Sequence, residues 1–272
     1  MFIYINVSTQ IKYVLEKTNL CNISANFILG HSTCYGVMRL DGQELVVKDY
    51  LLQGIAAGDF SQDGKMPSDY ALVEMFGVPR IKVRNVYNLL EKMGVIYSQK
   101  GVGRFLRHRQ KPLEVVMYGD VSFSEKMLDH TSNYKSIVTK IEQVPNDHFI
   151  FSKPYVNNGT LYLIERLRFI DGEPAAIHRS YVVADNMPEI KQVNNRLTSM
   201  FQFYKQHGVN QFRSSFSQLS VIFPNELDRA LLDCEILVPL VKVESDNWDA
   251  GRNVLLEYTE IFYRTDRFFF QI

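Results

Sequence analysis

The hydrophobic positions between residues 66 and 106 predict two short helices followed by two short strands. Apolar residues at helical spacing mark the first helix, after the candidate N-cap Ser68: Ala71, Leu72 and Met75. Gly77 lies in the turn that follows, because glycine reaches positive φ angles without strain. Pro79 suits the first position of the second helix, where its missing N–H is not needed. The apolar stripe of this second helix consists of Ile81, Val83, Val86, Leu89, Leu90 and Met93.

The polar side of the second predicted helix is basic and carries amide groups: Arg80, Lys82, Arg84, Asn85 and Asn88. Two short helices that meet at a glycine turn, with a basic second helix, are typical of a DNA-binding helix-turn-helix. The strands predicted at 95–98 and 104–106 enclose a basic, glycine-rich loop and so add a wing. An ordinary helical hairpin with a solvated charged face is the alternative, but the wing and the segregated charge favour DNA binding.

A further helix is predicted over residues 44–57, ahead of the helix-turn-helix, and Gly58 ends it. Its residues suited to burial are Leu45, Val46, Tyr50, Leu51, Ile55 and Ala56. Residues 1–43 show no clear pattern, and three structural interpretations stay open for them: an added helix, a dimer contact or a loosely ordered extension.

After Pro112 the pattern changes and strand-like runs dominate, which predicts a second domain. These runs are 113–118, 148–152, 160–170, 175–183, 218–222, 238–244, 254–264 and 267–272. Helical patterns occur at 124–130, 188–194, 199–207 and 225–232. This order indicates an α+β domain built on an antiparallel sheet. We therefore expect a first domain at 44–108, a linker at 109–118 and a second domain at 119–272.

Strand alternation between residues 161 and 170 places Arg166 and Arg168 on one face, opposite an apolar face. Two arginines side by side suit an anion, although acidic neighbours on a solvated sheet could also satisfy them. Asp171 and Gly172 form a hairpin turn signal. A two-residue loop would pair Arg166 with Ile177, and a three-residue loop would pair it with His178. The three-residue loop is favoured, because Pro174 interrupts the tighter ladder.

Further candidate site residues lie in other parts of the second domain. Glu257 and Tyr263 share one face of a predicted strand near the C-terminus. Ser122 and Glu125 fit a capping box around Phe123 and Ser124, and Ser199 precedes another predicted helix. The free N–H groups of such helix starts favour an anion.

The charge distribution agrees with a DNA-binding first domain, although the formal net charge of the chain is zero. Between residues 80 and 111, nine basic residues face a single acid, Glu91, which leaves a net charge of +8. Such a local basic patch is the electrostatic mark of a phosphate-binding surface.

The three cysteines, Cys21, Cys34 and Cys234, show neither paired nor metal-ligand spacing. They are typical of reduced thiols in a cytoplasmic protein, so neither a metal nor another cofactor is expected. The N-terminus lacks the basic region of a signal peptide. No segment approaches the roughly 20 apolar residues of a membrane span, and no membrane partner is expected.

The first domain resembles the winged-helix DNA-binding domain of GntR-type bacterial transcription regulators. The matching positions, with order and spacing kept, are Pro67, Ser68, Leu72, Val78, Arg80, Val83, Arg84, Leu90, Gly94, Ile96, Gly101, Gly103 and Phe105. The chain departs from the family pattern at Pro79, Lys82 and Arg104, which lie on the expected DNA face. The resemblance implies DNA contacts from Ser68, Arg80, Lys82, Arg84, Asn85, Lys100, Gly101, Gly103 and Arg104.

The second domain looks like the UTRA effector-binding domain of the HutC branch of this family, whose fold is similar to that of chorismate lyase. The resembling segments are 123–125, 165–168, 172–174, 199–201, 257–258 and 263–268. The resemblance implies an effector site made of Phe123, Ser124, Arg166, Arg168, His178, Ser199, Glu257 and Tyr263. His178 stands where sugar-binding relatives often carry Glu, a change that would suit a second acidic group on the ligand.

Together these features predict a homodimeric, ligand-responsive repressor that binds a palindromic double-stranded operator. The implied effector is a small anion such as a sugar phosphate, a phosphonate or a carboxylic acid. One alternative is a lyase-like enzyme acting on a small carboxylate, although no nucleophile–base–orienter set supports it and no catalytic residue is expected. Another alternative is an architectural DNA-binding dimer that responds to no ligand.

Overall fold

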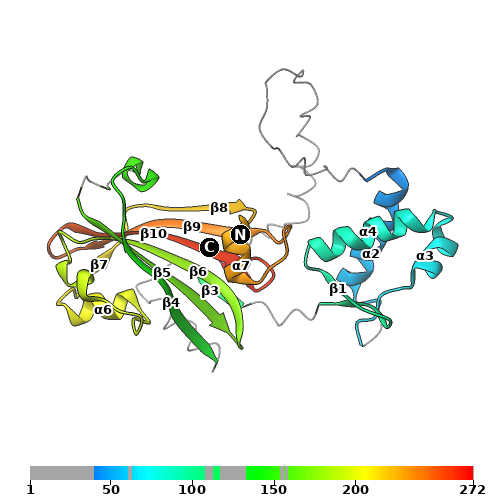
Figure 1. Cartoon of the computed structure of the whole chain (residues 1–272), viewed down its shortest axis with the longest axis horizontal. Coiled ribbons are helices and arrows are strands. Elements are labelled where there is room, and N and C mark those ends of the chain that lie inside the picture. The colour runs from blue at the N-terminus through cyan, green and yellow to red at the C-terminus, as the bar shows by residue number, and fades with distance from the viewer. Residues whose placement is uncertain are drawn as a thin grey trace, which may run out of the picture. The chain divides into compact units, whose positions relative to one another are not determined.

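A computed structural model of the chain describes residues 40–60, 63–107, 113–116, 133–153, 156 and 159–271. The expectations for residues 1–39, for Phe123 and for Ser124 lie outside these residues. Below, the first domain means the described residues up to 107, and the second domain means those from 113 onward (Figure 1).

The first domain is a helix-turn-helix with a supporting helix and a two-stranded wing (Figure 1). Its elements are α2 (Gly42–Ala57), α3 (Asp69–Phe76), α4 (Arg80–Lys92), β1 (Ile96–Gln99) and β2 (Gly103–Leu106). The two strands pair antiparallel from Ile96 opposite Leu106 to Gln99 opposite Gly103. These elements confirm the predicted helices and wing.

Local chemistry explains why the helices begin and end where they do. The hydroxyl of Ser68 accepts a hydrogen bond from the N–H of Ala71 at 3.1 Å and caps α3. Gly77 ends α3 with a φ of 62°, which glycine adopts without strain. Pro79 is the N-cap of α4, one position before the helix rather than within it.

The core of the first domain is made by one face of each helix and by the first wing strand. Its buried apolar residues are Val47, Leu51, Met66, Leu72, Val78, Val83, Val86, Tyr87, Leu90, Val95 and Ile96. Tyr87 is completely buried, and its hydroxyl donates to the carbonyl of Pro67 at 2.5 Å. A buried hydroxyl of this kind costs little only when it is hydrogen-bonded.

The predicted burial of several apolar residues is wrong. The exposed ones are Leu45, Val46, Tyr50 and Ala56 of α2, Ala71 and Met75 of α3, and Ile81 of α4. The buried face of α2 contains the predicted Leu51, together with Val47 and Gly54, which were not predicted. Gly54 fixes this orientation, because a β-carbon there would lie 2.7 Å from the ring of Phe60.

The second domain contains a seven-stranded sheet in which all paired strands are antiparallel. The strands are β4 (Tyr134–Gln143), β5 (Leu161–Ile170), β6 (Glu173–Val183), β10 (Val254–Arg264), β9 (Leu240–Asp249), β7 (Phe212–Arg213) and β8 (Ser217–Ile222). They follow the order β4-β5-β6-β10-β9-β7, and β8 also pairs with β9. Separately, β3 (Leu113–Val116) pairs in parallel with β11 (Phe268–Gln271), so part of the expected linker is a strand.

Different helices cover the two faces of the sheet (Figure 1). On one face, α6 (Met200–Gln206) and the 3-10 helix η2 (Pro188–Gln192) pack on Ile164 and Val182. On the other face, Leu232 of α7 (Glu226–Leu232) packs with Leu167 and Ile177. No helix in the described part of the chain is long and apolar enough to cross a membrane.

Two expectations for the second domain need correction. The segment 148–152 is no strand: residues Phe149–Ser152 form a 3-10 helix, η1, capped by the imidazole of His148, which accepts from the N–H of Ile150. Strand β4 was not anticipated, because it lies at the sheet edge and its side chains are mostly exposed or half-buried. Without a buried face, the apolar–polar alternation that marks a strand is weak.

The β5–β6 hairpin confirms the predicted pairing of Arg166 with His178, but by a different route. The loop contains only Asp171 and Gly172, with φ angles of 51° and 82°. A register shift between Arg168 and Phe169 then moves the ladder by one residue. A β-bulge near Pro174 therefore replaces the expected three-residue loop.

Candidate functional site

The predicted DNA-contacting residues of α4 differ in how freely their side chains can move. Arg80 is held by Asp69, with 3.2 Å between Nε and Oδ2, and lies over the ring of Tyr70 at 4.8 Å. It nevertheless keeps 54% of its side chain exposed. Arg84 is exposed, and among the described residues no carboxylate lies within ion-pair distance of it.

Lys82 and Asn85 are engaged by the N-terminus of α2. The ammonium of Lys82 contacts Asp41 at 2.5 Å and Gln43 at 2.7 Å. The amide of Asn85 donates to Glu44 at 2.8 Å, and Glu44 is itself part of the capping box of α2. These contacts fasten α2 to α4, and the pKa of Asp41 is lowered mainly by its hydrogen bond from Lys82.

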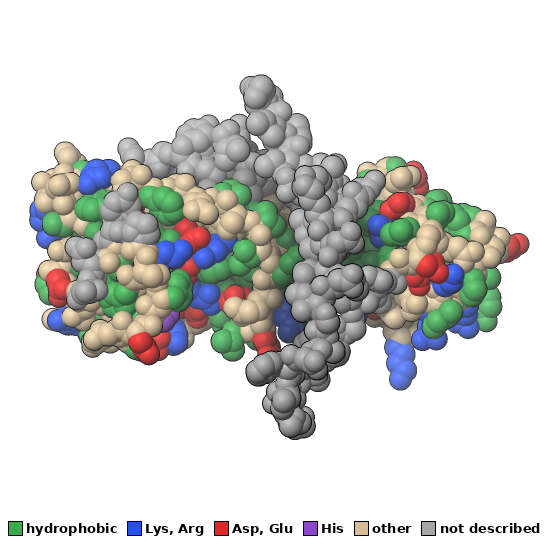
Figure 2. All heavy atoms as spheres, turned by 90° about the horizontal axis from the view of Figure 1, so that it is seen from above, with side chains coloured by type: hydrophobic (Ala, Val, Ile, Leu, Met, Phe, Trp, Pro, Cys, Tyr) green, Lys and Arg blue, Asp and Glu red, His purple; other side chains and the backbone are tan. Residues whose placement is uncertain are grey.

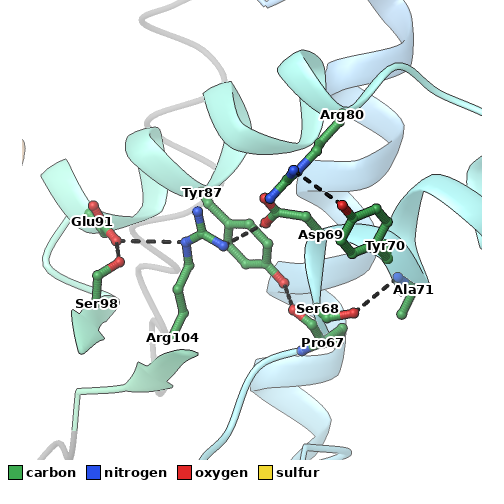
Figure 3. A network of polar contacts seen from close by, with 10 residues as sticks. All are labelled: Pro67, Ser68, Asp69, Tyr70, Ala71, Arg80, Tyr87, Glu91, Ser98 and Arg104. Atoms are coloured by element: carbon green, nitrogen blue, oxygen red, sulfur yellow. Dashed lines mark hydrogen bonds and ion pairs between the residues drawn. The ribbon is translucent and has the colours of Figure 1, made fainter. Parts of the chain in front are cut away.

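Arg104 of the wing lies against the helices rather than at the wing tip (Figure 3). Its guanidinium pairs with Asp69 at 2.6 Å and lies over the ring of Tyr87 at 4.2 Å. Only 21% of its side chain is exposed. In contrast, Lys100 and Gly101 are exposed at the tip, and Gly103 follows with a φ of 145°.

The second domain contains a cavity of about 250 Å³ between α6 and the sheet. Its lining includes the predicted residues Arg166, Arg168, His178, Ser199 and Glu257. It also includes residues that were not predicted: Ser180, Met200, Phe201, Phe212, Arg213, Ser214, Ser245, Asp246, Asn247, Thr259 and Ile261. This volume lies just below the range of about 300–1,000 Å³ that is typical of ligand pockets, so it suits a small ligand.

The two arginines are buried together, with about 3% of each residue exposed. Arg166 donates weakly to Ser180 at 3.3 Å and to the carbonyl of Thr198 at 3.4 Å. Among the described residues, its Nε finds no hydrogen-bond acceptor. Burial lowers the pKa of Arg166, and it lowers that of Arg168 to about 10. A guanidinium group stays protonated in proteins at neutral pH, so both side chains are positively charged.

Glu257 is the acid that faces these arginines. It is buried, and Asn247 donates to its Oε1 at 3.3 Å. Burial raises its pKa, while the charge of Arg166 acts in the opposite direction. One carboxylate beside two guanidinium groups leaves this part of the cavity positively charged, which suits an anionic ligand.

His178 lies directly across the β5–β6 ladder from Arg166. Burial, followed by the charges of Arg168 and Arg166, holds its pKa well below the ordinary value. The imidazole is therefore neutral at pH 7 and can both donate and accept a hydrogen bond.

The remaining predicted effector residues have different positions. The hydroxyl of Ser199 accepts from the N–H of Gln202 at 3.3 Å and caps α6 at the cavity. Tyr263 does not line the cavity: it is buried behind His178, with 5.9 Å between the ring centroids. Phe123 and Ser124 lie outside the described residues.

Some lining residues could have been found by strand alternation. Ser180 follows His178 by two residues on the same face of β6. Ser245 and Asn247 were missed because the strand was predicted to stop at residue 244, whereas β9 continues to Asp249. Phe212 belongs to a two-residue strand, which is too short to give a periodic signal.

One face of the second domain carries side chains of both charges. On the face seen in Figure 2, basic and acidic side chains are interspersed with hydrophobic ones. The positive charge placed directly at the cavity is the buried pair Arg166 and Arg168.

Comparison with known proteins identifies both domains. The model for bacterial regulatory proteins of the gntR family matches residues 43–106, and the UTRA domain model matches residues 130–268. The chain is 22% identical over 228 residues to the mannosyl-D-glycerate transport/metabolism system repressor MngR of Escherichia coli, covering 83% of this chain and 93% of that protein. It is 21% identical over 221 residues to a probable fructoselysine utilization operon transcriptional repressor of Shigella flexneri, covering 81% and 90%.

Among solved structures, PhnF from Mycobacterium smegmatis shares the fold, with a TM-score of 0.52 and 17% identity over 83% of this chain and 97% of that one. The relatives are transcription regulators and not enzymes, so the lyase alternative is not supported. The chain belongs to the GntR family of bacterial transcription regulators, with a helix-turn-helix domain followed by a UTRA domain.

Proposed function

We propose that this regulator is a repressor that binds a palindromic operator as a homodimer and leaves it when a small anion occupies the cavity. One relative is named as a repressor and the other as a probable repressor, which supports the direction of the response. A symmetric dimer presents two identical heads, and such a pair matches a palindromic site. The effector would act by binding one arrangement of the dimer more tightly than the other.

The observation that carries the effector class is the pair of buried arginines in the cavity. Arg166 and Arg168 both line it. The Nε of Arg166 is buried without an acceptor among the described residues, which is costly unless a ligand supplies one. A phosphate, phosphonate or carboxylate would supply the missing oxygens. The compounds named for the two relatives, mannosyl-D-glycerate and fructoselysine, both carry a carboxylate on a sugar conjugate.

The remaining lining residues then recognise the rest of the effector. We assign Glu257 to hydroxyl or amino groups, because its carboxylate can accept hydrogen bonds. His178 contacts the anion or its neighbouring oxygen, and Ser199 contributes from the start of α6. Tyr263 supports the ring of His178 rather than touching the ligand.

On the DNA side, Arg80 reads a base, since arginine reaches guanine with two hydrogen bonds. Arg84, Lys100 and Ser68 contact phosphates, and Gly101 and Gly103 let the wing approach the minor groove. Lys82 and Asn85 mainly hold α2 against α4, as their contacts with Asp41 and Glu44 suggest.

Thermal melting against a panel of sugar phosphates, phosphonates and sugar carboxylates tests the effector proposal. A ligand at a hundred times its dissociation constant stabilises the folded protein by about 2.7 kcal/mol. Arg166→Met should abolish the shift produced by the active class. Lys135→Met is the matched control, because Lys135 is exposed on β4 opposite Phe169 and loses the same charge outside the cavity.

Retention of the ligand shift in Arg166→Met would contradict the assignment of the cavity. No shift with any anion, together with intact operator binding, would instead favour the architectural alternative.

A further inference from the structure

A single carboxylate, that of Asp69, connects three elements of the helix-turn-helix domain (Figure 3). Asp69 is the first residue of α3 and is almost completely buried. Its Oδ1 contacts Arg104 of the wing at 2.6 Å, and its Oδ2 contacts Arg80 of α4 at 3.2 Å. Each arginine therefore uses one oxygen of the same carboxylate.

The two arginines are held unequally. Arg104 is fixed from three sides, by Asp69, by the ring of Tyr87 at 4.2 Å and by Glu91 at 3.8 Å. Tyr87 is itself immobilised by its hydrogen bond to the carbonyl of Pro67. Arg80 has the longer contact with Asp69 and much the more exposed side chain.

The contact of Arg104 with Asp69 limits how Asp69 can hold Arg80. A carboxylate with two accessible oxygens binds a guanidinium in a bidentate pair, which is stronger than a single contact. Because Arg104 occupies Oδ1, Arg80 is limited to Oδ2. The side chain is then oriented by Asp69 but remains exposed enough to leave for DNA.

We propose that Arg104 is a positioning residue for Arg80: by occupying one oxygen of Asp69, the wing sets how firmly the recognition helix arginine is held and so controls base discrimination. Arg104 thus acts through Asp69 and not by direct contact with DNA. The inference rests on the proposed base contact of Arg80. It accounts for an arginine and a tyrosine that stack on each other between the wing and α4.

The test measures discrimination, defined as the dissociation constant for random duplex divided by that for the operator. The operator is the sequence that the wild-type protein selects from a random pool. Arg104→Met should lower discrimination about tenfold, the size of one base contact, because Asp69 now holds Arg80 with both oxygens. Adding Asp69→Asn should restore part of it, since the competing carboxylate is gone. Such non-additivity is the mark of residues that act on one another.

Two further variants make the result unambiguous. Lys100→Met removes a cation from the exposed wing tip and should weaken operator and random duplex alike, leaving discrimination unchanged. Arg104→Lys keeps a cation that can still contact one oxygen of Asp69, and should therefore retain more discrimination than Arg104→Met. Melting temperatures of all variants exclude loss of folding as the cause.

The inference is overturned if Arg104→Met weakens both duplexes equally, or changes neither, or if Asp69→Asn fails to improve discrimination in the Arg104→Met background. Arg80→Ala separates this failure from that of the proposed function. Unchanged discrimination in Arg80→Ala would contradict the proposed base contact of Arg80. Lost discrimination in Arg80→Ala would support that base contact, independently of the result for Arg104.

Discussion

His178 is a neutral base placed beside two permanent cations. Arg166 faces it across the ladder, Arg168 adds a second positive charge, and the ring of Tyr263 closes the other side. In the folded protein, protonation of His178 is opposed mainly by its burial and, to a smaller extent, by the charges of the two arginines. In the unfolded chain the same imidazole titrates near its ordinary value of about 6.5.

The sign of the resulting pH dependence follows from proton uptake. Below about pH 6.5 the unfolded chain binds a proton at this site that the folded protein does not, so stability falls as the pH decreases. His178 should contribute up to about 1.4 kcal/mol per pH unit to this loss. Glu257 acts in the opposite direction, because its raised pKa lets the folded protein keep a proton that the unfolded chain has lost.

Chemical unfolding of wild type and His178→Gln between pH 5 and 7.5 isolates the contribution of His178 to the pH dependence of the unfolding free energy. The wild-type stability should fall more steeply toward pH 5 than that of the variant. Curves that run parallel over this range would mean that His178 does not titrate as inferred. The other histidines cancel in the difference, since the sequence has six and only one is changed.

At the scale of single elements, Ser68 at the start of α3 has two roles that substitutions can separate. Its hydroxyl caps α3 through the N–H of Ala71, and it is also the proposed phosphate contact. Aspartate caps a helix about as well as serine, but it brings a negative charge. The two roles therefore respond differently to the same substitution.

Ser68→Asp should keep the melting temperature within about a degree or two of wild type while strongly weakening DNA binding, because the new carboxylate faces phosphate. Ser68→Ala should instead lower the stability by about 1 kcal/mol. It should weaken DNA binding less than Ser68→Asp, because it removes only one neutral contact. Thermal melting and operator titration on the same samples check both. If Ser68→Asp binds the operator like wild type, Ser68 does not face the DNA backbone.

The element scale also shows what the sequence could predict. Helices α3 and α4 follow from an N-cap, a glycine turn and a long apolar stripe, all of which are local signals. The buried face of α2 followed only in part: Leu51 is buried as predicted, but Leu45, Val46 and Tyr50 are exposed. The apolar residues of α2 lie on more than one face, and the choice between faces depends on Gly54 meeting Phe60. That contact joins α2 to the segment after it and is invisible to periodicity.

The cavity residues were predicted only in part, because strand alternation is a local signal and the packing between elements is not. Strand alternation put Arg166, Arg168 and His178 on one face, and the ladder confirms their neighbourhood. The bulge near Pro174 reached the expected register by a route that turn rules alone do not supply. Tyr263 shares the strand face of Glu257, yet it lies beyond the end of the cavity, which only the packing of His178 and Phe268 reveals.

At the scale of the whole molecule, the proposed response couples two binding sites and must obey thermodynamic linkage. If the effector lowers operator affinity by a given factor, the operator must lower effector affinity by the same factor. Regulatory couplings are typically about 1–3 kcal/mol, which corresponds to roughly 5- to 150-fold. This symmetry holds whatever path joins the sites.

We therefore expect effector binding, measured by calorimetry, to weaken about tenfold when saturating operator duplex is present. A duplex with the operator sequence scrambled is the control and should have a smaller effect at the same salt concentration. Arg166→Met should bind the operator like wild type, with no dependence on effector, because the cavity and the DNA contacts involve different residues. Equal effector affinity with and without operator would show that the cavity ligand does not control DNA binding, and the effector would then have to act through stability or assembly of the dimer instead.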